Sequence, residues 1–123
     1  MPEHTRPALK LESRLIKFAV NVCEIAEKLP PTKTGNHVAR QLIRSCTSPA
    51  PNYGEAQSAE SRKDFIHKMK ICLKELREVN ISLRFIAHKK LIKLDVLAES
   101  LQESNELISI FVKSIATARK NLA

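Results

Sequence analysis

The sequence predicts an all-α protein built as an antiparallel up-down-up-down four-helix bundle. Apolar residues recur at alternating steps of four and three, which is the spacing of a helix that packs along other helices. The chain has two glycines, whereas a β-rich domain needs glycine at its turns. Its six prolines all lie at or before residue 51, so nothing in the second half interrupts long helices.

The length and composition indicate one globular domain. The chain has 123 residues, of which 43% are hydrophobic and 28% are charged, as in ordinary folded proteins. We expect residues 1–10 to form a flexible lead and residues 11–123 to form the single domain.

The first helix is expected over residues 11–29. Its apolar line follows the alternating spacing, and Pro30-Pro31 ends it because proline lacks an N–H and restricts the preceding residue. The line consists of Leu11, Leu15, Phe18, Val22, Ile25 and Leu29.

The second helix is expected over residues 36–57, with Thr34 or Asn36 as its cap. Its inward residues are Val38, Leu42 and Ile43. A proline inside a helix costs about 3 kcal/mol or kinks it. The prolines at 49 and 51 therefore predict a kink or a break near residues 49–51.

The third helix is expected over residues 61–88, where Ser61 and Asp64 resemble a capping box. One face is apolar and the opposite face is basic. The apolar line is Phe65, Met69, Cys72, Leu76, Val79, Leu83 and Ile86. The opposite line is Lys63, His67, Lys70, Lys74, Arg77, Ile81, Arg84 and His88.

The fourth helix is expected over residues 95–120, with Asp95 as its cap. Acidic residues fill its first half and basic residues its end, which complements the helix dipole. Its apolar line has one polar member, Ser104, among Leu97, Leu101, Ile108, Phe111, Ile115, Ala118 and Leu122.

The basic line of the third helix is the main candidate for function. The formal net charge is +8, and Lys89, Lys90 and Lys93 extend the positive run into the next turn. The line is either an ordinary solvated face or a surface for RNA, DNA or a nucleoprotein partner, which it would bind through phosphates. Tyr53 and Phe85 are the only rings outside the apolar lines, which disfavours single-strand stacking. A structural or protein-interaction scaffold with incidental charge is the alternative function.

Two further groups of residues have a structural and a functional interpretation. Ile71 and Phe85 widen the apolar face of the third helix and belong either to a broad core or to an oligomer interface. On an unbroken second helix, Arg44, Ser48, Asn52 and Glu55 share one face. They form either a structural polar cluster, in which Arg44 pairs with Glu55, or a ligand site.

Other classes of function have little support. The four histidines form no metal-binding pair, and the chain has no glycine-rich phosphate loop or nucleophile motif. We expect no enzyme activity, no cofactor and no metal. Three cysteines without a C-x-x-C pair are typical of buried residues in a reducing compartment. No apolar run predicts a membrane span and the first ten residues lack a signal-peptide core, so a cytoplasmic location without membrane contact is expected.

Several short motifs occur in order between Gln41 and Leu83. They are QLIRS at 41–45, Asn52-Tyr53 with Glu55-Ala56, AESRKDFIHK at 59–68 and LKELRE at 73–78. This stretch resembles the bacterial four helix bundle protein family, whose founding members are encoded in intervening sequences of 23S ribosomal RNA genes. The chain departs from the pattern at Pro49, Pro51 and Gly54.

The resemblance implies a homo-oligomer, a pentamer, without established enzymatic activity. A more distant similarity is to the accessory variability protein of diversity-generating retroelements. That protein is a basic pentameric barrel that works with a reverse transcriptase and nucleic acid.

Overall fold

The computed structural model describes residues 7–122, and this part of the chain is helical without a strand. Its five helices are α1 (Pro7–Glu27), α2 (Lys33–Thr47), α3 (Pro49–Gln57), α4 (Arg62–His88) and α5 (Leu94–Lys120). The all-α class is therefore confirmed. The second expected helix is divided into α2 and α3.

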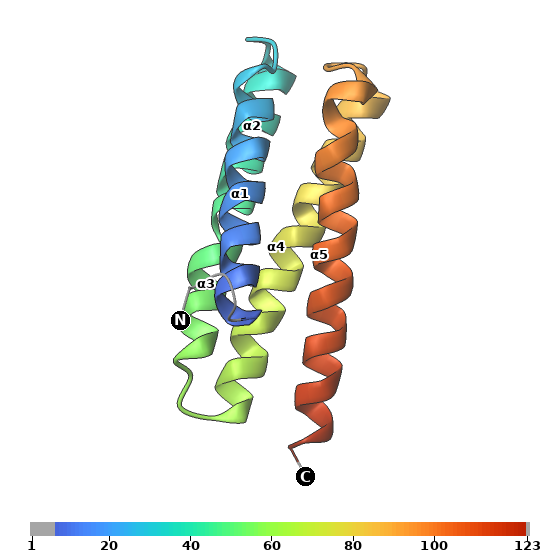
Figure 1. Cartoon of the computed structure of the whole chain (residues 1–123). Coiled ribbons are helices and arrows are strands. Elements are labelled where there is room, and N and C mark those ends of the chain that lie inside the picture. Colours follow the sequence, from blue (N-terminus) through green and yellow to red (C-terminus); the bar gives the residue numbers. More distant parts are fainter. Residues whose placement is uncertain (1–6, 123) are drawn as a thin grey trace.

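The long helices lie side by side along one direction (Figure 1). The chain ascends through α1, descends through α2 and α3, ascends through α4 and descends through α5, which is consistent with the expected up-down order. The most extensive packing joins α4 to α5 and α3 to α4, whereas α1 and α5 touch less. The rod of α2 and α3 thus occupies the place of one helix in a bundle.

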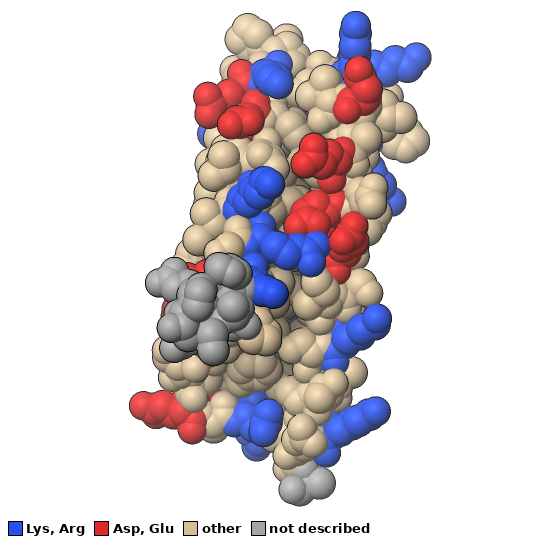
Figure 2. Space-filling model, in the orientation of Figure 1, with Lys and Arg blue, Asp and Glu red and all other residues tan. Residues whose placement is uncertain are grey.

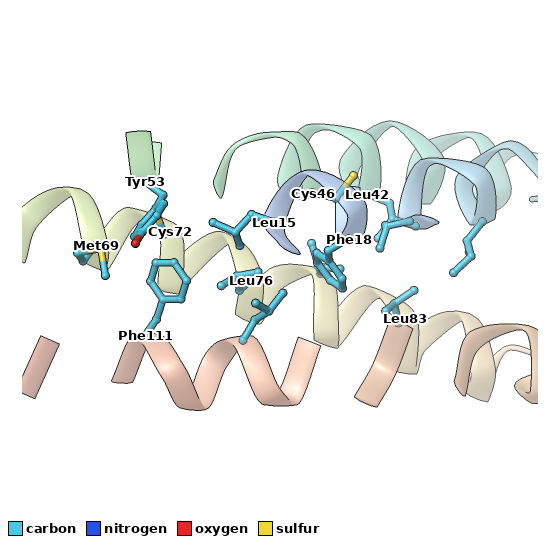
Figure 3. Close-up of a cluster of buried hydrophobic side chains, with 14 of the residues drawn as sticks. Leu15, Phe18, Leu42, Cys46, Tyr53, Met69, Cys72, Leu76, Leu83 and Phe111 are labelled. Carbon is cyan, nitrogen blue, oxygen red and sulfur yellow. The ribbon is translucent and has the colours of Figure 1, made fainter. Parts of the chain in front are cut away.

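The apolar lines of all helices meet in one core (Figure 3). Leu15 and Phe18 of α1 point toward α4 and α5, and Leu15 lies beside Leu76 of α4. These three side chains and Phe111 of α5 are at most 2% exposed. Tyr53 of α3 lies edge-on to Phe111, with ring centroids 5.8 Å apart at 71°. Such aromatic pairs add about 0.5–1.5 kcal/mol beyond the area they bury.

The interruption between α2 and α3 lies at Ser48. Pro49 and Pro51 have no N–H to donate to the helical carbonyls four residues earlier, so the hydrogen-bond ladder fails there. Ser48 keeps helical dihedral angles (φ −79°, ψ −38°), and Asn52 N–H donates to its carbonyl at 3.2 Å. The chain therefore continues in the same general direction through a one-residue break.

Two expected helix starts and one expected helix cap were wrong. The expected lead of residues 1–10 is shortened by α1, which begins at Pro7 because the first helical position needs no N–H; residues 1–6 lie outside the described residues. Helix α2 begins at Lys33, where Thr32 Oγ1 accepts a hydrogen bond from Gly35 N at 3.0 Å. The position before α5 is Lys93 rather than Asp95, which lies in the first turn.

Candidate nucleic-acid interface

Helix α4 carries the candidate interface, and its start sets which residues face outward. Ser61 Oγ accepts a hydrogen bond from Asp64 N at 3.1 Å, as the capping pattern predicts. The helix then continues to His88 without proline or glycine. Because the helix is unbroken, residues three and four positions apart share one face, and the apolar and basic lines lie on opposite faces.

The two faces of α4 differ sharply in exposure. The inward side chains of Met69, Leu76 and Leu83 are 0–1% exposed. The opposite side is exposed at every cationic position. We call this set the α4 basic line: Lys63, His67, Lys70, Lys74, Arg77 and Arg84.

The charges of the α4 basic line are not neutralised within residues 7–122. In that range, the cations in ion pairs are Arg14, Arg44 and Lys68. Each of these approaches a carboxylate on another helix, whereas no member of the α4 basic line does so in the described chain. Five fixed positive charges along one helix therefore face solvent together.

A groove between α4 and α5 adds a cation from the last helix. The groove has a volume of about 360 Å³, and Lys70, Arg77 and Arg119 lie around it. Its apolar lining comes from Leu73 and Ile115, among others. We did not assign Arg119 to the interface from the sequence; the available signal was the basic end of the fourth helix.

The three lysines of the following turn are also exposed. Lys89 caps α4, and Lys90 has a left-handed backbone with φ 58°. Leu91 N donates to Ile86 O at 3.0 Å, which closes the helix end in a Schellman-type turn. Lys93 follows immediately before α5. Ile81, at 58% exposed, interrupts the cations between Arg77 and Arg84 on the way to this turn.

The expected cluster of Arg44, Ser48, Asn52 and Glu55 does not form one unit. Asn52 Nδ2 donates to Ser48 Oγ at 3.0 Å, but Glu55 pairs with Lys68 Nζ at 2.9 Å. The expected pair of Arg44 with Glu55 was wrong, because eleven residues along a helix separate the two by about 16 Å. Helix α4 supplies closer partners to both residues.

Arg44 instead joins α2 to two carboxylates of α4. Its Nη1 lies 3.3 Å from Glu75 Oε2, and its Nη2 lies 3.2 Å from Glu78 Oε2. Ser45 Oγ also donates to Glu78 Oε2 at 3.1 Å. Arg44, Ser45, Glu75 and Glu78 therefore satisfy one another's polar groups, and this geometry indicates a structural role between α2 and α4.

The two carboxylates of this cluster have opposite pKa shifts. Burial, reinforced by the adjacent Glu78, raises the pKa of Glu75 against the opposing charge of Arg44. Burial also acts to raise the pKa of Glu78, but hydrogen bonds with Glu75, Ser45 and Arg44 outweigh it and lower that pKa. The hydrogen bond with Glu78 and the negative charges of Glu75 and Glu78 raise the pKa of Arg44.

The two residues expected in an oligomer interface, Ile71 and Phe85, differ in exposure. Phe85 is 46% exposed and Ile71 is half-buried. Tyr53, expected as a possible stacking platform, is 6% exposed and belongs to the core. Ile43, expected to face inward, is 40% exposed, so that expectation was wrong.

The face formed by α1 and α5 has a different charge pattern. Figure 2 shows acidic side chains over the first half of α5 and basic ones near its end. Arg14 Nη2 lies 2.6 Å from Glu103 Oε1 and 3.2 Å from Glu106 Oε1. The groove at this place, of about 430 Å³, is therefore bridged by an ion pair.

Residues 7–122 contain no group of three or more His, Cys, Asp and Glu residues placed to hold a metal ion. Within the same range, each helix is too short or too polar to cross a membrane. Every buried side-chain nitrogen or oxygen in this part of the chain has a hydrogen-bond partner.

Comparison with known proteins places the chain in a family. The sequence model described as 23S rRNA-intervening sequence protein matches residues 8–113. A solved structure from Bacteroides thetaiotaomicron, described as a protein with unknown function from the S23 ribosomal protein family, is 28% identical. The similarity covers 85% of this chain and 97% of that one, with a TM-score of 0.78. No curated protein matches the chain. With most of its residues matched, the chain belongs to the 23S rRNA-intervening sequence protein family.

Proposed function

We propose that the protein is a non-enzymatic nucleic-acid-binding protein whose contact surface is the α4 basic line. The observation that supports this most directly is the absence of internal ion pairs along the line, within residues 7–122, on a face that is exposed throughout. Unpaired surface cations bind phosphates by releasing condensed counterions. Cations already paired to carboxylates, such as Arg14 and Arg44, gain less from such contacts.

The preferred ligand in this proposal is duplex or structured RNA or DNA, alone or within a nucleoprotein. From Lys63 to Arg84 the line spans about 32 Å at 1.5 Å per residue, which is close to one turn of a duplex. Phe85 is the one aromatic ring among the large exposed apolar residues of the described chain, so stacking with single strands has little support. Contacts through phosphates alone would discriminate little between sequences.

We also propose self-association, as the resemblance to pentameric relatives implies, with Phe85 and the half-buried Ile71 in the contact. Exposed apolar side chains on other helices, Ile16 and Val20 of α1 and Ile43 of α2, offer a surface for the facing subunit. Several copies of a weak phosphate-binding surface would raise the overall affinity through avidity. We place this assembly in the cytoplasm, where its three free cysteines would be kept reduced.

A gel-shift experiment with duplex RNA and duplex DNA tests the proposed contact surface. Changing Lys70, Lys74 and Arg77 to Glu takes the formal charge from +8 to +2 and is expected to weaken binding about tenfold or more. A matched variant changes Lys10, Lys28 and Lys33 to Glu, with the same net charge. These three residues are exposed; Lys10 lies on α1, Lys28 in the turn that follows α1, and Lys33 at the start of α2.

The comparison between the two variants shows whether binding depends on the α4 basic line or only on the net positive charge of the protein. Binding through the α4 basic line requires a much larger loss in the first variant, with helicity and mass unchanged, and a steep fall in affinity with salt. Equal losses in both variants, or salt-independent binding, would contradict the proposal. A scaffold with incidental charge would show equal losses, together with one stoichiometric protein partner in a pull-down.

Light scattering tests self-association separately. The wild-type chain is expected to have the mass of an oligomer, with and without RNA. Phe85→Asp is expected to lower that mass by introducing a charge into an apolar contact, whereas Lys28→Asp, at an exposed polar position, is expected to leave it unchanged. A monomer at tens of micromolar wild-type protein would exclude this part of the proposal.

A further inference from the structure

Two of the three cysteines lie in contact across the α1–α2 pair. Cys23 Sγ of α1 and Cys46 Sγ of α2 are 3.6 Å apart, although 22 residues separate them in the sequence. A disulfide bond measures about 2.05 Å, so closing it requires an approach of about 1.5 Å. Rotations of the two side chains on their adjacent helices cover this distance.

The two sulfur atoms differ in access to solvent. Cys46 is fully buried, whereas Cys23 is half-buried and lines a groove of about 440 Å³ with Ile16, Val20 and Ala50. A small oxidant in this groove reaches the Cys23 sulfur first. Burial raises the pKa of the Cys46 thiol to about 12, so it is a neutral thiol at physiological pH.

The third cysteine has a different environment. Cys72 is fully buried, and its thiol donates to Pro49 O at 3.4 Å. Among the described residues, the only sulfur–sulfur contact is the one between Cys23 and Cys46. Cys72 therefore serves as an internal reference for oxidation of the other two.

We propose that Cys23 and Cys46 are a redox-active dithiol that a peroxide converts into an intramolecular disulfide between α1 and α2. The Cys23 thiol releases its proton to solvent, and the resulting thiolate attacks one peroxide oxygen. The O–O bond breaks, which leaves Cys23 as a sulfenic acid, and the departing hydroxide takes up a proton from solvent to form the first water. The Cys46 sulfur then attacks the Cys23 sulfur. Its proton and the sulfenic hydroxyl leave as water, so two thiols and hydrogen peroxide give one disulfide and two waters.

The disulfide would tie the two helices together beyond their short connection. A cross-link that closes a loop of this length stabilises a protein chiefly by restricting the unfolded chain. We expect the oxidised protein to unfold about 5 °C or more above the reduced protein, and a thiol reductant to reverse the shift. This inference is independent of nucleic-acid binding.

Thiol titration and peptide mapping of the intact chain test the proposal. After treatment with equimolar hydrogen peroxide, the protein is expected to lose two of three free thiols and the mass of two hydrogen atoms. Non-reduced peptides are expected to link Cys23 to Cys46. Cys72→Ser should form the same bond, whereas Cys46→Ala should leave Cys23 as a sulfenic acid that dimedone traps.

The wild-type peptide map decides the proposal even if a variant fails to fold. A disulfide that includes Cys72, a cross-link between two chains, or three intact thiols at equimolar peroxide would each overturn it. Oxidation of Cys23 to a sulfinic acid without a disulfide would overturn it as well, because it would show that Cys46 does not reach the oxidised sulfur.

Discussion

Arg44 of α2 reaches the nearly buried carboxylate of Glu75 on α4, with 3.3 Å between Nη1 and Oε2. The side chain of Glu75 is 6% exposed, whereas that of Arg44 is 61% exposed. The cation therefore retains much of its hydration while the carboxylate loses most of its own. Burial dominates, and it raises the pKa of Glu75 despite the nearby guanidinium.

Glu75→Gln is expected to stabilise the protein at pH 7 by about 1 kcal/mol, because the amide keeps a hydrogen-bonding shape without a buried charge. A raised carboxyl pKa means that the folded state holds the proton more tightly than the unfolded state. The wild type therefore loses stability as the pH rises through the raised pKa of Glu75. The gain of the variant should disappear in thermal unfolding at a pH below the ordinary carboxyl range.

Glu78→Gln is the matched control, with the opposite sign. The pKa of Glu78 is lowered, so its ionised form stabilises the fold above the ordinary carboxyl range, and this contribution is lost as the pH falls. The variant is expected to be less stable than the wild type at pH 7 and equally stable in acid. Gains from both substitutions at pH 7 would contradict the assignment.

The two glycines are expected to respond oppositely to alanine. A Cβ at Gly35 would lie 1.9 Å from Pro30 O, so Gly35→Ala must displace backbone and should cost about 1–3 kcal/mol. A Cβ at Gly54 meets no atom within 4 Å. Gly54→Ala is therefore expected to stabilise α3 by about 0.5–1 kcal/mol. Urea unfolding of both variants measures the difference; equal effects would refute the close contact at Gly35.

Lys90 is the one non-glycine residue with positive φ in the described chain. A left-handed backbone costs an L-residue roughly 1–2 kcal/mol, and glycine avoids this cost. Lys90→Gly should therefore raise the free energy of unfolding, by about 0.5–1 kcal/mol after the extra freedom of the unfolded chain is counted. Lys90→Ala removes the same charge without relieving the backbone, and so should not stabilise the protein in the same chemical denaturation assay.

A buried polar contact joins α4 to α5. Asn80 Nδ2 donates to Ser104 Oγ at 2.8 Å, and Ser104 Oγ in turn donates to Leu101 O at 2.7 Å. In a double-mutant cycle with Asn80→Ala and Ser104→Ala, we expect a coupling of about 0.5–1.5 kcal/mol from the free energies of unfolding. A coupling near zero would mean that the two side chains contribute independently.

The sequence by itself determined which side of α4 is buried. The α4 basic line is exposed as predicted, and the opposite apolar line is buried apart from Phe65, which lies at its edge. This inference succeeds because side chains three and four positions apart share one face of any helix, whatever its neighbours are. The cap at Ser61 was also predictable from the sequence, because the acceptor Ser61 Oγ and the donor Asp64 N are only three residues apart.

Only the tertiary structure decided which residues meet between helices. Arg44 contacts Glu75 and Glu78 instead of Glu55, Cys23 meets Cys46, and Arg119 joins the α4 groove. These pairings depend on how far one helix slides along another. Hydrophobic periodicity determines the rotation of a helix toward the core but leaves this axial position open, so contacts between distant segments follow only once the helices have packed.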